Sequence, residues 1–132
     1  MKFLIKFTLF SLESDNNYDK TSWTNNGITV TIHDVQQFLD DINEPVIEIP
    51  VNKIKKMCVH LDKTDYKTLQ RSENSDLYYP IIITKNEKGL KMILDGHHRL
   101  LKAINHNITT IKSRILDLTR YDIPIEFKKV FD

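Results

Sequence analysis

The residues best suited to bind an anion form one short run in the second half of the chain. They are Asp95, Gly96, His97, His98 and Arg99. Apolar residues precede them, and apolar residues at helical spacing follow, which predicts a strand ending at the aspartate and a helix beginning near the first histidine. The first turn of a helix has N–H groups without intrahelical acceptors and carries a partial positive charge. The predicted turn therefore suits an anion, above all phosphate.

Four residues at or near this turn fit a phosphate-binding role. Gly96 has no Cβ to hold a ligand away from the backbone, and His98 and Arg99 supply hydrogen-bond donors over the same turn. Lys102 lies one helical turn further on and adds a positive charge. We therefore expect the phosphates of a ligand to contact this group.

Asp95 and the first histidine each have two interpretations. Asp95 is either a metal ligand or general base, or a helix cap that holds Arg99 or His98. His97 either stacks against a nucleobase or faces solvent, and no spacing in the chain supports a zinc site. In a phosphotransferase, Asp95 and His98 would be the catalytic candidates, with Mg²⁺ bridging phosphate oxygens. The purely structural alternative is a capped helix in which Arg99 pairs with a carboxylate.

A second segment supports a family resemblance. The run from Asp95 to Arg99 is preceded by a strand, a turn and a strand that begin with Tyr79-Pro80-Ile81-Ile82-Ile83. Together these segments resemble the signature of the ParB/sulfiredoxin-like superfamily, which includes ParB-like nucleases and free-serine kinases. The resemblance covers roughly residues 46–118, and it implies that Gly96, His98 and Arg99 bind the phosphates of a nucleotide such as ATP, ADP or CTP.

The chain departs from two branches of that superfamily. Sulfiredoxins place their catalytic cysteine where this chain has His97, so sulfinic acid reductase activity is not expected. Free-serine kinases carry a catalytic glutamate in the region that corresponds to residues 51–71, where this chain has none. His60, Asp62 and Asp65 are the substitutes that this region offers. We therefore expect nucleotide-phosphate binding, with phosphoryl transfer or hydrolysis as its enzymatic extension.

Other functions stay open at this point. One is a non-enzymatic regulatory module that binds nucleic acid or protein, like ParB-type proteins, although the chain is too short for their DNA-binding helical domains. A ParB-like nuclease is another, although nothing resembles a two-metal carboxylate cluster. A third is a protein partner bound by the acidic N-terminal section, whose helix carries Asp40, Asp41 and Glu44 on one flank.

Composition limits these choices. The chain has 132 residues, of which 40% are apolar, and it can bury one core of ordinary size. Its net charge of +1 argues against a protein that grips duplex DNA over many phosphates. Residues 1–44 hold 3 of the 19 basic and 7 of the 18 acidic residues. The section with the motif is therefore the basic one, which suits an anionic ligand.

Two features indicate a cytoplasmic protein. The single cysteine, Cys58, cannot form an internal disulfide, which fits a reducing compartment. Residues 1–10 resemble a signal peptide superficially, but Lys6 interrupts the apolar run and no small-residue cleavage site follows. No stretch approaches the roughly 20 apolar residues that span a bilayer. We expect no membrane partner.

The order of elements predicts an α/β (α+β) fold. We expect a β-hairpin and helix extension over residues 1–44 and a ParB/sulfiredoxin-like core over residues 45–132, with a small mixed sheet and flanking helices. In the extension, a strand at 3–9 is expected to pair with 28–32 across a long loop, and Asp34 to cap a helix ending near Ile42. Core strands are predicted at 46–51, 79–84, 90–94 and 111–118, helices near 54–61, 65–71 and 97–104, and a packed tail at 121–130.

Overall fold

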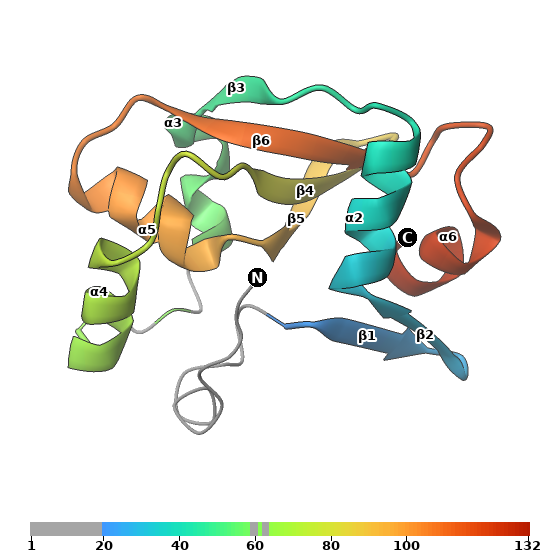
Figure 1. Ribbon diagram of the computed structural model, residues 1–132, viewed down its shortest axis with the longest axis horizontal. Helices are drawn as coiled ribbons and strands as arrows, with labels where there is room; N and C mark the ends of the chain where they lie inside the picture. Colours follow the sequence, from blue (N-terminus) through green and yellow to red (C-terminus); the bar gives the residue numbers. More distant parts are fainter. Residues whose placement is uncertain (1–19, 59–60, 62–63) are drawn as a thin grey trace.

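The computed structural model describes residues 20–58, 61 and 64–132. Within this part of the chain, a four-stranded sheet and a two-stranded hairpin combine with helices (Figure 1). The α+β class and the N-terminal hairpin are confirmed. The predicted strand at residues 3–9 lies outside the described residues.

The elements follow one another in the order that the sequence predicts for the core. They are β1 (Ser22–Asn25), β2 (Ile28–Thr31), α2 (Ile32–Asp41), β3 (Ile47–Pro50), α3 (Val51–Ile54), the 3₁₀ helix η2 (Lys55–Cys58), α4 (Tyr66–Glu73), β4 (Ile81–Asn86), β5 (Gly89–Asp95), α5 (His97–Asn105), β6 (Thr110–Asp117) and α6 (Ile125–Phe131). None of the helices in the described ranges is both long and apolar enough to cross a bilayer.

The larger sheet is mixed and has the order β3-β6-β4-β5. β4 pairs antiparallel with β5, and β6 returns beside β4 in parallel after α5 crosses between them. Residues 81–84 of β4 are all buried, as expected for a strand covered on both faces. The unbroken apolar run that predicted this strand reflects that double burial.

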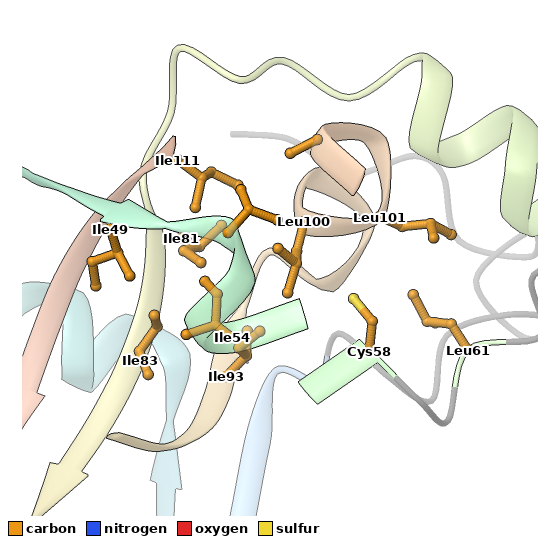
Figure 2. Packing of buried hydrophobic residues seen from close by; sticks show 12 residues of the cluster. Ile49, Ile54, Cys58, Leu61, Ile81, Ile83, Ile93, Leu100, Leu101 and Ile111 are labelled. Atoms are coloured by element: carbon orange, nitrogen blue, oxygen red, sulfur yellow. The ribbon is translucent and has the colours of Figure 1, made fainter. Parts of the chain in front are cut away.

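Each face of the sheet carries its own apolar cluster. Ile81 and Ile83 of β4 pack with α3, η2 and α5 on one face, where Figure 2 shows Leu100, Ile54 and Cys58 among the cluster. Side chains alternate along a strand. Ile82 therefore belongs to the opposite cluster, with α2, the hairpin and α6.

The extension packs on the core through that second cluster. Val30 of β2 and Leu39 of α2 are buried with Leu94 and Leu116 of the larger sheet. Arg114 of β6 also holds the end of α2, since its guanidinium donates to Asp40 Oδ1 at 2.8 Å and to the Leu39 carbonyl at 3.1 Å. The division at residues 44 and 45 stays a prediction, because a shared core does not decide where a domain ends.

The hairpin differs from the prediction in its partner strand. β2 pairs with Ser22–Asn25, in a segment that we expected to be loop. Asn26 and Gly27 have φ values of 53° and 78°, which suit the tight two-residue turn favoured between neighbouring strands. The predicted partner at residues 3–9 lies outside the described residues, so the long-loop pairing stays a prediction. Among the described residues, the Asn-Gly turn joins β2 to the adjacent strand β1.

The tail prediction is also revised. Part of residues 121–130 forms α6, whose Phe127 is buried against Phe38 at a ring-centroid distance of 5.6 Å. Trp23 of β1 lies edge-on to Phe131, at 5.3 Å. Not all of the predicted tail packs, because Ile125, the first residue of α6, is 57% exposed.

The start of α2 is a capping box in which Asp34 is the third helical residue and Thr31 is the cap. Asp34 N–H donates to Thr31 Oγ1 at 3.0 Å, and Thr31 N–H donates to Asp34 Oδ2 at 2.9 Å. Asp34 as the cap itself is therefore wrong by three positions. The hydrogen bond from the Thr31 backbone, followed by the one from its side chain, lowers the pKa of Asp34 below its usual 3.8.

This lowered pKa predicts a pH-dependent part of the stability. A carboxyl group with a lower pKa in the folded state stabilises the fold at pH above its unfolded pKa, and that stability is lost as pH falls through the folded pKa. The wild type should therefore exceed Asp34→Ala in unfolding free energy at pH 7, and the difference should shrink below about pH 3.8. Denaturant unfolding between pH 7 and pH 2.5 measures it.

The matched control is Asp34→Asn, which keeps an acceptor but cannot titrate. The difference between the asparagine and alanine variants should stay constant over the same range. A wild-type advantage over Asp34→Ala that is unchanged at pH 2.5 would contradict the assignment.

Candidate anion-binding site at the start of α5

The strand-to-helix turn forms where the sequence predicts it. β5 ends at Asp95, Gly96 is the N-cap with φ of 105°, and α5 begins at His97. The first backbone hydrogen bond of the helix runs from Leu100 N–H to the Gly96 carbonyl at 2.9 Å. The positive end of the α5 dipole therefore lies at this turn.

Gly96 is required at the turn for two separate reasons. Its positive φ is unfavourable for residues with a Cβ. A Cβ at this position would also lie 2.4 Å from Cγ2 and 2.8 Å from Cβ of Ile81. The space left by the missing side chain is thus filled by Ile81, and Gly96 itself is buried. The prediction that a ligand enters this space is therefore not met, because the Ile81 side chain of β4 packs there.

The two histidines lie inside the protein. His97 is 6% and His98 is 3% exposed. The His97 carbonyl accepts a hydrogen bond from Sγ of the buried Cys58 at 3.5 Å, which ties α5 to η2. The interpretation of His97 as a solvent-facing residue is therefore wrong. The reachable side of the turn is the one that carries the partly exposed Asp95 and Arg99.

Arg99 joins the turn to the loop that enters β4. Its Nη1 donates to the Pro80 carbonyl at 2.6 Å and to the Tyr79 carbonyl at 3.2 Å. Its Nη2 contacts Asp95 Oδ2 at 3.3 Å, as an i,i+4 ion pair. The side chains of Arg99 and Asp95 are 19% and 27% exposed. The structural alternative predicted that Arg99 pairs with a carboxylate. Asp95 is that carboxylate, but the other two contacts of Arg99 are with backbone carbonyls.

Lys102 holds the same loop further upstream. Its Nζ donates to the Ser75 carbonyl at 2.7 Å. Figure 1 shows the connection from α4 to β4 running alongside α5, and the two cations of α5 fasten it at Ser75 and at Tyr79–Pro80. Asp95 and Arg99 are thus brought together at the turn, while Gly96 and both histidines are buried beneath it. Lys102 lies in the last turn of α5 and contacts the same loop at Ser75.

The two cations of α5 make most of their hydrogen bonds to neutral carbonyls. Arg99 has one carboxylate partner and two carbonyl partners, and the acceptor for Lys102 is a carbonyl. Hydrogen bonds to neutral carbonyls satisfy the donors without cancelling their charge. Arg99 and Lys102 therefore keep their positive charges beside the carboxylates of Asp95 and of Asp76, which lies on the same loop.

The loop residues Ser75, Tyr79 and Pro80 are the part of the site that the sequence did not reveal. Tyr79 and Pro80 were assigned to the strand, which begins instead at Ile81. The residue before a proline favours extended backbone, so the Tyr-Pro pair resembled the strand that follows. Their carbonyl contacts join residues about twenty positions apart, which no local pattern encodes.

Metal-ligating residues do not gather here. Among the described residues, no three His, Cys, Asp or Glu side chains lie close enough to hold a metal ion together. A Mg²⁺ ion at this turn would therefore depend on the phosphate oxygens of a ligand for much of its coordination.

Comparison with protein-family models, curated proteins and solved structures finds no match to this chain. The α+β class is established by the structure itself. The resemblance to the ParB/sulfiredoxin-like superfamily depends on the residues of the turn and on the strand that precedes it.

Substitution of Gly96 tests the packing of the turn. Gly96→Ala should destabilise the protein by about 1–2 kcal/mol for the left-handed backbone, plus roughly 1–3 kcal/mol for overpacking against Ile81. Chemical denaturation measures the loss. Gly89→Ala is the matched control, because Gly89 also has a positive φ of 114° but open space around the added Cβ. Equal losses in the two variants would contradict the close packing.

Proposed function

We propose that this protein binds a nucleoside di- or triphosphate, ATP, ADP or CTP, together with Mg²⁺, through the Arg99 side of the α5 turn. The proposal includes a ParB/sulfiredoxin-like core. The observation that carries it is Arg99 in the first turn of α5, at the positive end of the helix, with Lys102 in the last turn of the same helix. Both cations donate largely to carbonyls of the loop before β4.

Phosphate is the ligand class that matches this arrangement. A guanidinium presents a planar fork of donors that fits phosphate oxygens, and a phosphate adds the attraction of its negative charge, which a carbonyl lacks. A phosphate can therefore compete with the Tyr79 carbonyl at 3.2 Å and with the 3.3 Å contact to Asp95. The shorter bond to Pro80 would keep the guanidinium in place.

The buried histidines have a supporting role in this proposal. His98 was expected to donate to phosphate, but only 3% of its surface is exposed. We assign His97 and His98 to the underside of the turn, where they help to fix the start of α5. Ligand contact is assigned to Arg99 and Lys102, with the backbone at Gly96 contributing through the helix dipole.

Ligand-induced stabilisation tests the binding site. The purified protein is heated with ATP, ADP, CTP, GTP or inorganic phosphate, each with and without Mg²⁺. A ligand at 100 times its Kd stabilises the fold by about 2.7 kcal/mol, which raises Tm by several degrees. Arg99→Ala should weaken binding of the responding nucleotide by roughly 10- to 100-fold, because it removes charged hydrogen bonds.

Two further variants serve as controls for this experiment. Because Arg99→Ala also loses the contacts with the loop, its Tm with ligand is compared with its own Tm without ligand. Arg99→Lys keeps the positive charge but lacks the planar guanidinium, and it should bind with intermediate affinity. Lys128→Ala removes an exposed cation of α6 and should bind as the wild type does. No shift with any nucleotide, or equal loss in Lys128→Ala and Arg99→Ala, would reject the site.

Phosphoryl transfer or hydrolysis is the enzymatic form of the proposal, and Asp95 is its candidate base or metal-contacting group. Asp95 is partly exposed beside Arg99, at the position where phosphate oxygens and Mg²⁺ would meet. Asp95→Asn should abolish nucleotide turnover while nucleotide affinity changes by less than about threefold, because amide and carboxylate are nearly isosteric. Phosphate release and calorimetry measure the two quantities. Unchanged turnover in the variant would leave a binding module without catalysis by Asp95.

We also propose that the protein is cytoplasmic and that its acidic N-terminal section binds a protein partner. One carboxylate of that section, Asp40, is already engaged by Arg114 within the molecule. Asp41 is exposed and Glu44 is partly buried, and they supply the remaining acidic surface.

A further inference from the structure

Two neighbouring tyrosines stand exposed on the loop that the cations of α5 hold. Tyr78 is 69% and Tyr79 is 58% exposed. Their rings meet edge to face, with centroids 5.4 Å apart and an interplanar angle of 87°. Exposed aromatic side chains that lie together are typical of binding surfaces, because each ring offers a large apolar area and a polar tip.

The backbone beneath these rings is held at several points. Arg99 donates to the Tyr79 carbonyl, and Tyr78 N–H donates to Asp76 Oδ1 at 2.9 Å. Lys102 fastens Ser75 at the start of the same loop. The rings are thus exposed although their backbone is fixed, and a ligand that used them would lose little free energy in ordering the loop.

We propose that Tyr79 is the stacking platform for the nucleobase of the bound nucleotide. This inference rests on the proposed function, since the Arg99 side of the turn must hold the phosphates. It adds the chemical class recognised at the other end of the ligand, which is a planar aromatic base. Stacking of a base on an aromatic side chain requires a free ring face and tolerates different bases.

The distances along the chain suit one nucleotide. Gly96 lies directly against Ile81, because a Cβ added to Gly96 would be only 3.2 Å from the Ile81 Cα. Tyr79 is two residues from Ile81, and two extended residues span about 7 Å. Arg99 reaches the carbonyl of Tyr79 directly. The Arg99 guanidinium therefore lies beside the backbone from which the Tyr79 ring extends.

Tyr79 is chosen over its neighbour because of Lys112. The Lys112 Nζ lies 4.6 Å from the ring centroid of Tyr78, where it covers that face as a cation–π contact. Tyr78 in turn supports Tyr79 through the edge-to-face contact.

Calorimetry with a matched pair of ligands tests the inference. ATP and CTP carry a base, whereas inorganic tripolyphosphate carries the phosphates alone; all three are titrated with Mg²⁺. Tyr79→Ala should weaken the better-bound nucleotide by roughly 5- to 100-fold and leave tripolyphosphate affinity unchanged. The variant keeps the loop anchored, because Arg99 contacts the carbonyl of Tyr79 and not its side chain.

Two controls separate stacking from other effects. Tyr79→Phe keeps the ring and should bind nucleotide as the wild type does. Tyr121→Ala removes a tyrosine that is 99% exposed between β6 and α6, and it should have no effect.

Every outcome decides between the proposals. Tripolyphosphate binding equal to nucleotide binding in the wild type keeps the phosphate site and rejects the platform. Equal loss of both ligands in Tyr79→Ala also rejects stacking, because it indicates a general role in the loop. Failure of the wild type to bind any of the three rejects the proposed function and the platform with it.

Discussion

The contact between the Gly96 backbone and the Ile81 side chain fixes where α5 begins relative to β4. No room exists for a Cβ between them, so the end of β5 and the start of α5 lie directly against the first residue of β4. From that point α5 directs Leu100 and Leu101 into the core and Arg99 toward the loop before β4. One backbone position therefore determines both the packing of the helix and the place of its cations.

The cations of α5 combine structural and chemical functions that are difficult to separate. Arg99 and Lys102 replace the backbone partners that an irregular loop would lack, since the carbonyls of Ser75, Tyr79 and Pro80 accept these side-chain hydrogen bonds outside any strand pairing. Arg99 lies in the first turn of α5, so its bonds keep a positive charge at the positive end of the helix, which is electrostatically unfavourable in isolation. An anion at this place would relieve that repulsion, whereas a further cation would increase it.

The sequence predicted the local structure of the turn but not its surroundings. The apolar run of β4, the boundary at Gly96 and the start of α4 near Asp65 depend on residues close in the chain, and all three formed as expected. The partners of Arg99 and Lys102 lie 19 to 27 residues away. The pairing of β1 with β2 was missed for a local reason, because polar residues around Trp23 concealed a short strand.

The five-residue run at the turn divides into an inner and an outer part, and this division limits what a motif can say about function. Gly96, His97 and His98 are buried, so their residue types are constrained by packing against β4 and η2 as much as by any ligand. Asp95 and Arg99 keep partial exposure and carry the charge. Selectivity among phosphate ligands must then come from groups next to Asp95 and Arg99. Those groups belong to the loop before β4, whose residues can change without altering the run itself.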